Sequence, residues 1–160
     1  MTDFGIARAL HLIMIVLWIG GVGMVTTVLL PGIRRSHSPK ERFAAFHAIE
    51  ARFASQSRWT TSVAGLSGLY MLWRIDAWDR FTSAAFWWMH AMVLTWLVFT
   101  LMLFVAEPIF LDRWLERRAA RNAEATYRLV ERLHWLLLTL GLVTIAGAAA
   151  GVAGVNLAGF

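Results

Sequence analysis

Two histidines, His11 and His90, each lie inside a long uncharged stretch of this 160-residue chain. An ionisable side chain costs free energy in an apolar segment, so its presence there usually serves a ligand, a proton or a helix contact. The nitrogen of a neutral imidazole is a good ligand for transition metals, including haem iron. Whether the two histidines can share a ligand depends on the elements that carry them.

Long runs without charge dominate the sequence. Hydrophobic residues make up 59% of the chain and charged residues only 16%. Three stretches contain no lysine, arginine, aspartate or glutamate: 9–33, 81–106 and 133–160. The hydrocarbon core of a bilayer is about 30 Å thick, so a helix that rises about 1.5 Å per residue crosses it with about 20 mostly apolar residues. Each of these stretches is long enough to predict a membrane span.

A fourth, shorter uncharged run extends from Trp59 to Trp73. It reaches the length of a span only if the helix begins near Phe53, which leaves Arg58 at the inner boundary. We therefore predict an all-α integral membrane protein with a single domain, an antiparallel four-helix bundle joined by short connections. The expected spans are near 6–30, 53–73, 85–106 and 132–154.

The basic residues predict which way the bundle faces. They gather between the first two spans and between the last two: Arg34, Arg35, Lys40, Arg42, Arg52 and Arg58, then Arg113, Arg117, Arg118, Arg121, Arg128 and Arg132. The remaining connection has only Arg74 and Arg80, offset by Asp76 and Asp79. By the positive-inside rule both termini lie outside, and we expect a multi-pass protein of a bacterial inner membrane. This asymmetry explains the net charge of +5, so nucleic-acid binding is not expected.

This topology places His11 and His90 at the same depth. Each lies about five residues inside the outer end of its span, or roughly 8 Å deep. A haem set on edge between two helices needs one imidazole from each side at matching depth. We predict haem b near the outer face between the first and third helices, with these two histidines as axial ligands. Arg8, Arg74 and Arg80 lie at the same surface, where they can pair with the haem propionates.

Other interpretations of the same residues stay open. Histidines in spans also serve as hydrogen-bonding groups between helices or as proton carriers. Met14, Met89 and Met92 lie close to the two histidines in sequence, and thioethers together with imidazole suit copper(I). Packing of the apolar core explains the same methionines.

The inner side of the bundle holds further candidates. His134 and His47 can form a second haem site there, although a solvated or capping role also accounts for them. Arg58 and Glu107 fall at the inner edges of adjacent spans, and we expect an ion pair between them that fixes helix register.

Short motifs resemble two families of small membrane proteins. A resemblance to the first span shared by CopD-type copper-resistance proteins and HemJ-type protoporphyrinogen oxidases is carried by Ala9-Leu10-His11-Leu12-Ile13 and Trp18-Ile19-Gly20-Gly21. The HemJ-type second and third spans are similar to Ile49-Glu50-Ala51-Arg52-Phe53 and Trp88-Met89-His90-Ala91-Met92. Both resemblances imply a membrane helical bundle with a histidine-bound redox cofactor, and they cover about the first two thirds of the chain.

Departures from both families limit what is carried over. HemJ-type proteins have a lysine soon after the third-span histidine, where this chain has Met92, so protoporphyrinogen oxidase activity is not implied. CopD-type proteins are longer and have more spans, so copper import is not implied either.

The expected function is one-electron transfer by a membrane b-type haem protein, with a quinone or a redox protein as partner. The alternatives are a CopD-like copper-binding or copper-transport protein and a cofactor-free accessory subunit of a membrane complex. The sequence leaves open whether the chain is an oxidoreductase enzyme and whether it forms homo-oligomers.

Overall fold

The computed structural model describes residues 2–154, and every regular element in that range is helical. The elements in chain order are α1 (Thr2–Met24), η1 (Val25–Leu29), α2 (Leu30–Ser36), α3 (Arg42–Arg74), η2 (Trp78–Thr82), η3 (Ala84–Phe86), α4 (Trp87–Leu101), η4 (Met102–Leu111), α5 (Asp112–Arg121) and α6 (Ala123–Val152). Of these, η1 and η4 are π-helical, whereas η2 and η3 are 3-10 helices. Four long helical rods result, as the sequence predicts, because α1 continues through η1 into α2 and η3 continues through α4 and η4 into α5.

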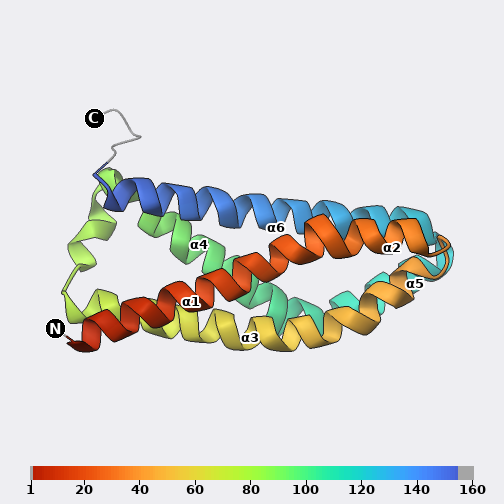
Figure 1. Cartoon of the computed structure of the whole chain (residues 1–160), viewed down its shortest axis with the longest axis horizontal. Helices are drawn as coiled ribbons and strands as arrows, with labels where there is room; N and C mark the ends of the chain where they lie inside the picture. The colour runs from red at the N-terminus through yellow and green to blue at the C-terminus, as the bar shows by residue number, and fades with distance from the viewer. Residues whose placement is uncertain (1, 155–160) are drawn as a thin grey trace.

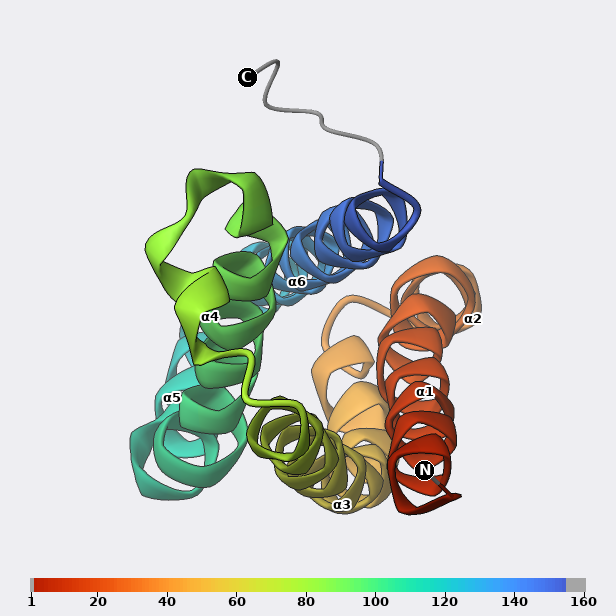
Figure 2. The same cartoon turned by 90° about the vertical axis from the view of Figure 1, so that its left-hand side faces the viewer.

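The four rods form an elongated bundle with two distinct ends (Figure 1). The end that holds the start of α1, the segments η2 and η3, and the end of α6 is called the terminal end. The opposite end, where α2 turns into α3 and α5 meets α6, is called the connection end. At the terminal end α1 lies beside α3 and α4 lies beside α6, as the end-on view shows (Figure 2).

Three of the four rods are long and apolar enough to cross a membrane: Thr2–Ser36, Ala84–Arg121 and Ala123–Val152. These helices extend beyond the predicted spans, because the polar residues that bound an apolar run do not interrupt helical hydrogen bonding. This composition is compatible with a membrane protein. The predicted span at 53–73 lies in α3, which does not belong to this set, and it stays a prediction.

The polar residues of α3 explain its low hydropathy. Ser57, Thr60, Thr61 and Ser67 are buried in the bundle. Within the predicted span, α3 exposes the large apolar residues Trp59, Leu66, Leu69 and Trp73, and its exposed polar residues, Ser55 and Gln56, lie near the start of that span. A helix with hydroxyl groups facing its neighbours and apolar side chains facing outward is the arrangement expected where lipid is the surrounding medium.

Both π-helical segments have a local cause. Thr26 and Thr27 at the start of η1 donate their hydroxyl groups to the carbonyls of Val22 and Gly23, each at 2.7 Å, and so compete with the ordinary backbone bonds. Pro31 then lacks the N–H that would bond four residues back. In η4, Pro108 lies inside the segment and removes another donor. Such widened turns are frequent at functional sites.

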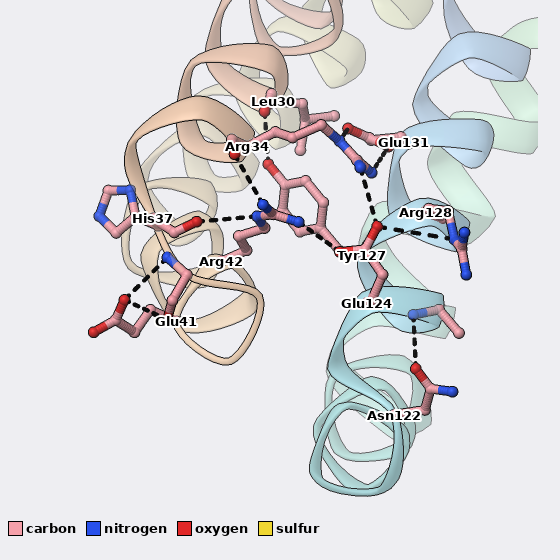
Figure 3. A network of polar contacts seen from close by, with 12 residues as sticks. Leu30, Arg34, His37, Glu41, Arg42, Asn122, Glu124, Tyr127, Arg128 and Glu131 are labelled. Atoms are coloured by element: carbon pink, nitrogen blue, oxygen red, sulfur yellow. Dashed lines mark hydrogen bonds and ion pairs between the residues drawn. The ribbon is translucent and has the colours of Figure 1, made fainter.

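A network of charged side chains ties the connection end together (Figure 3). Arg34 donates two hydrogen bonds to Glu131, at 2.8 and 2.5 Å, and a third to Glu124 at 3.0 Å. Arg42 donates to the other oxygen of Glu124 at 2.5 Å. Beside this network, the hydroxyl of Tyr127 donates to the carbonyl of Leu30 at 2.7 Å. The turn between α2 and α3 is therefore fixed to α6, which positions the residues at the start of α3.

The start of α3 differs slightly from the sequence pattern. Ser38 to Glu41 have the spacing of a capping box, which predicts a helix from about residue 39. The backbone N–H of Ser38 does donate to Glu41, at 3.1 Å, but its hydroxyl donates to the same carboxylate at 2.6 Å. Residues 39–41 form a turn and α3 begins at Arg42. The two bonds from Ser38, chiefly that from its hydroxyl, hold the pKa of Glu41 below its usual value.

Asn122 is expected to contribute measurably to the stability of α6. Its side-chain oxygen accepts the backbone N–H of Ala125 at 2.9 Å, which caps the N-terminus of the helix. Replacing it by alanine leaves that N–H to solvent and should lower the free energy of unfolding by about 1 kcal/mol. Thermal unfolding in mild detergent measures the change, and Asn122→Asp should retain most of the stability because its carboxylate also caps.

Candidate functional site

His11 is held by α3 through one ring nitrogen. Its Nδ1 lies 2.8 Å from the carbonyl oxygen of Ala64 and 3.2 Å from the hydroxyl of Ser67. A carbonyl oxygen only accepts hydrogen bonds, so Nδ1 carries the proton and Nε2 keeps a free lone pair. A histidine that ligates a metal typically has this arrangement, because the bond at one nitrogen fixes the ring and the tautomer.

The close approach of α1 and α3 at His11 depends on a glycine. A Cβ atom at Gly68 would lie 3.1 Å from Cε1 of His11. That spacing is tighter than ordinary van der Waals contact, so a larger residue would push the ring away from Ala64. Gly68 therefore helps to orient the imidazole.

His90 has different surroundings. It is exposed near the start of α4, and its Nε2 donates to the carbonyl of Phe81 at 3.1 Å. Its ring also meets the Phe81 ring edge-on, with 5.3 Å between the centroids. The nitrogen left free is therefore Nδ1. Both histidines lie toward the terminal end, but in the described contacts each faces its own neighbour, His11 on α3 and His90 on η2.

The three arginines predicted to pair with haem propionates also have different surroundings. Arg74 forms an ion pair with Asp3, with 2.8 Å between Nε and Oδ2, and the hydroxyl of Tyr70 donates to the same oxygen. Arg80 lies over the ring of Phe86, 5.4 Å from its centroid. Arg8 is exposed one turn before His11. Arg8 and Arg80 form no ion pair within residues 2–154, so they are the arginines best able to meet an anionic group.

The methionines near the histidines pack in the protein interior. Met89 is buried in α4, and Met14 packs against the apolar cluster formed by Trp18, Ile19, Val22, Ala64, Phe99 and Leu138. Met92 is half-buried. Core packing accounts for these positions.

Buried polar atoms without a partner lie deeper in the bundle. In the described part of the chain they are Trp18 Nε1, Ser57 Oγ, Thr61 Oγ1 and Thr100 Oγ1. An unpaired buried donor costs about 1–3 kcal/mol, so each such atom is a candidate for an interaction with a bound group. Trp18 follows His11 by seven residues and so lies on the same face of α1. This face contains one oriented imidazole and one unpaired indole N–H.

A second group of titratable residues lies in the half of the bundle nearer the connection end. Side-chain ligand atoms of His47, Glu50 and Asp112 all lie within 4.8 Å of one another. Nδ1 of His47 is 3.4 Å from Oε2 of Glu50. Burial raises the pKa of Glu50 to about 7, and the nearby charges of Glu107 and Asp112 add to the increase. We call these three residues the His47 cluster.

A cavity of about 80 Å³ adjoins the His47 cluster. Its polar lining residues are Glu50, Ser57, Glu107 and His134, and the rest of the lining is apolar. Nδ1 of His134 donates to the carbonyl of Val130 at 2.9 Å, which leaves Nε2 free, as in His11. No hydrogen bond or ring contact among the described residues joins His134 to His47, and a second haem at these two residues stays a prediction.

The predicted ion pair between Arg58 and Glu107 is confirmed. Nη2 of Arg58 lies 2.9 Å from Oε1 of Glu107, and its Nε donates to the carbonyl of Leu103 at 3.1 Å.

The sequence did not single out Glu50, Ser57 and Asp112 as candidate metal or cavity residues. The spacing of His47 and Glu50, three residues apart on one helix, was the available signal for the first of these. Nothing in the sequence connects Asp112 to them.

In the described residues, the fold is an all-helical bundle with three helices long and apolar enough to cross a membrane, and His11, His90 and His134 each have one ring nitrogen hydrogen-bonded to a backbone carbonyl. No protein-family model, no curated protein and no solved structure matches the chain. The resemblance to CopD-type and HemJ-type proteins therefore rests on the short motifs around His11, Glu50 and His90 alone.

Proposed function

We propose that the chain is a multi-pass protein of a bacterial inner membrane that binds haem b at the terminal end and transfers single electrons. The observation that carries the proposal is the hydrogen bond from Nδ1 of His11 to the carbonyl of Ala64. It leaves Nε2 as a neutral, oriented ligand on a helix with the composition of a membrane span.

The remaining residues of the proposed site have distinct roles. His90, which lies toward the same end of the bundle, would supply the second imidazole that holds the haem. Arg8 and Arg80 would meet the propionates, while Arg74 is already neutralised by Asp3. The unpaired N–H of Trp18 provides a polar contact on the same face of α1 as His11.

Haem bound here would supply an iron that accepts and releases one electron. The protein residues contribute the ligand field, an apolar surrounding and positive charge near the propionates, which together tune the reduction potential. A quinone in the bilayer or a redox protein at its surface is the proposed electron partner.

The optical spectrum of the purified protein tests this function. Wild-type protein, expressed with haem available and purified in mild detergent, should show a Soret band and, after reduction, a sharp α band. His11→Ala should reduce the haem bound per chain at least tenfold, because it removes the oriented ligand. His90→Ala should shift the bands by changing the axial ligation.

His37→Ala is the matched control for these variants. His37 is exposed beyond the end of α2, at the connection end, and its ring contacts only the neighbouring Ser36 among the described hydrogen bonds. This variant should keep the wild-type spectrum. A colourless wild-type protein that elutes as a folded species, or full haem content in His11→Ala, contradicts the proposed function.

A further inference from the structure

We propose that His47, Glu50 and Asp112 bind a divalent first-row transition cation in the half of the bundle nearer the connection end, with the adjoining cavity holding its water ligands. This site is separate from the proposed haem site and does not depend on it.

The three side chains already converge from two elements. His47 and Glu50 lie one turn apart on α3, and Asp112 is the first residue of α5. Their ligand atoms lie within 4.8 Å of one another. In a tetrahedral site with bonds of about 2.1 Å, ligand atoms are about 3.4 Å apart. Small rotamer changes therefore close the cluster around an ion, with no movement of the helices.

The charges of the cluster favour a cation. Among the described residues, neither Glu50 nor Asp112 forms an ion pair with a lysine or arginine. Arg58, whose partners Glu107 and Leu103 line the cavity, is committed to the carboxylate of Glu107 and to the carbonyl of Leu103. Two carboxylates are thus held close together, half-buried, with an imidazole beside them and the carboxylate of Glu107 nearby. A bound divalent cation would offset this repulsion.

Ser57 gives independent support. It is only 2% exposed, and its hydroxyl has no hydrogen-bond partner in the described part of the chain. Ser57 follows Glu50 by seven residues, so both project from the same face of α3, and both line the cavity. The cavity of about 80 Å³ has room for roughly two water molecules. A water bound to the cation could then accept or donate the hydrogen bond that Ser57 lacks.

The types of ligand select the class of cation. A site made of oxygen ligands alone suits Mg²⁺ and Ca²⁺, which bind six or more oxygen atoms supplied by the protein and by water. An imidazole nitrogen with two carboxylates suits Mn²⁺, Fe²⁺, Co²⁺ or Zn²⁺. The site should therefore discriminate against Mg²⁺ and Ca²⁺.

Titration of the full-length, chelator-stripped protein with Mn²⁺ tests the proposal, because the electron paramagnetic resonance signal of free Mn²⁺ weakens on binding. Wild-type protein should bind one Mn²⁺ per chain, and a hundredfold excess of Mg²⁺ should not displace it. Glu50→Gln and Asp112→Asn should each weaken binding at least tenfold without changing the haem content. Glu116→Gln is the matched control, since it removes one carboxylate charge from an exposed position on the same α5 helix.

Ser57→Ala should change the thermal stability and the Mn²⁺ affinity of the protein in opposite directions. It removes an unpaired hydroxyl, so it should raise the Tm of the stripped protein, yet it should weaken Mn²⁺ binding. Absence of Mn²⁺ binding by folded wild-type protein overturns the proposal, whatever the variants do. Equal loss of affinity in Glu50→Gln and Glu116→Gln also overturns it, because binding would then reflect general surface charge.

Discussion

Replacing Gly65 by alanine should destabilise the bundle by about 2–3 kcal/mol, although alanine forms helices better than glycine. A Cβ atom at this position would lie 2.4 Å from Nε1 of Trp96 on α4, a distance at which the indole must move. That indole N–H donates to the carbonyl of Thr61 at 3.0 Å. The substitution therefore both overpacks the contact between α3 and α4 and breaks a hydrogen bond worth about 1 kcal/mol.

Gly20→Ala is the matched control for this prediction. Gly20 is also inside a helix, but it is exposed and a Cβ atom there would have no neighbour within 4 Å. The same change should stabilise the protein by about 0.5–1 kcal/mol, because it removes the conformational entropy of glycine. Thermal unfolding of both variants in mild detergent measures the difference. If Gly65→Ala unfolds at the temperature of Gly20→Ala, the close contact with Trp96 does not exist.

For glycines in these helices, the sequence predicts that helices approach closely but not which side chain each glycine contacts. Small residues in apolar helices indicate close helix approach. The sequence does not reveal that Gly147 and Gly151 on α6 receive the rings of Trp87 and Trp88 from α4, because a contact between distant helices depends on how each is rotated about its axis. Three of the four rods were predictable from charge-free runs long enough for a span, and the fourth from a shorter run extended back to Phe53.

For the two histidines as well, the sequence predicts how deep each residue lies along its helix but not the direction in which its side chain points. The rise of about 1.5 Å per residue was enough to predict that His11 and His90 lie toward one end of the bundle. Their directions depend on tertiary contacts: Ala64 fixes the ring of His11, and the carbonyl of Phe81 contacts that of His90. Each residue along a helix turns by about 100°, so a small error in rotation changes the neighbour that a side chain meets.

The ion pair between Arg58 and Glu107 was predictable because both residues interrupt apolar runs at the same depth. The cluster of His47, Glu50 and Asp112 was not, since Asp112 follows a π-helical segment whose widened turns alter the direction of every later side chain. Periodicity computed for an α-helix loses its register across such a segment.

Arg58→Met should be markedly more destabilising than Glu107→Leu, although both break the same ion pair. Loss of Arg58 leaves the carboxylate of Glu107, whose side chain is only 12% exposed, without its cation at the edge of the cavity. Removing one partner of a buried pair costs about 3–5 kcal/mol, and the upper part of that range does not apply here because Arg58 itself is 36% exposed. We expect a loss of about 3 kcal/mol in the free energy of unfolding.

Glu107→Leu should cost only about 1 kcal/mol, because Arg58 keeps its hydrogen bond to the carbonyl of Leu103 and can reach water. The double variant should be close to wild type in stability, since it removes both charges and replaces them with apolar side chains of similar size. Unfolding of the four proteins in mild detergent completes the double-mutant cycle, and the losses expected here correspond to a coupling energy of about 4 kcal/mol. Additive losses would mean that the two side chains do not interact, and equal single losses would mean that Glu107 is as well solvated as Arg58.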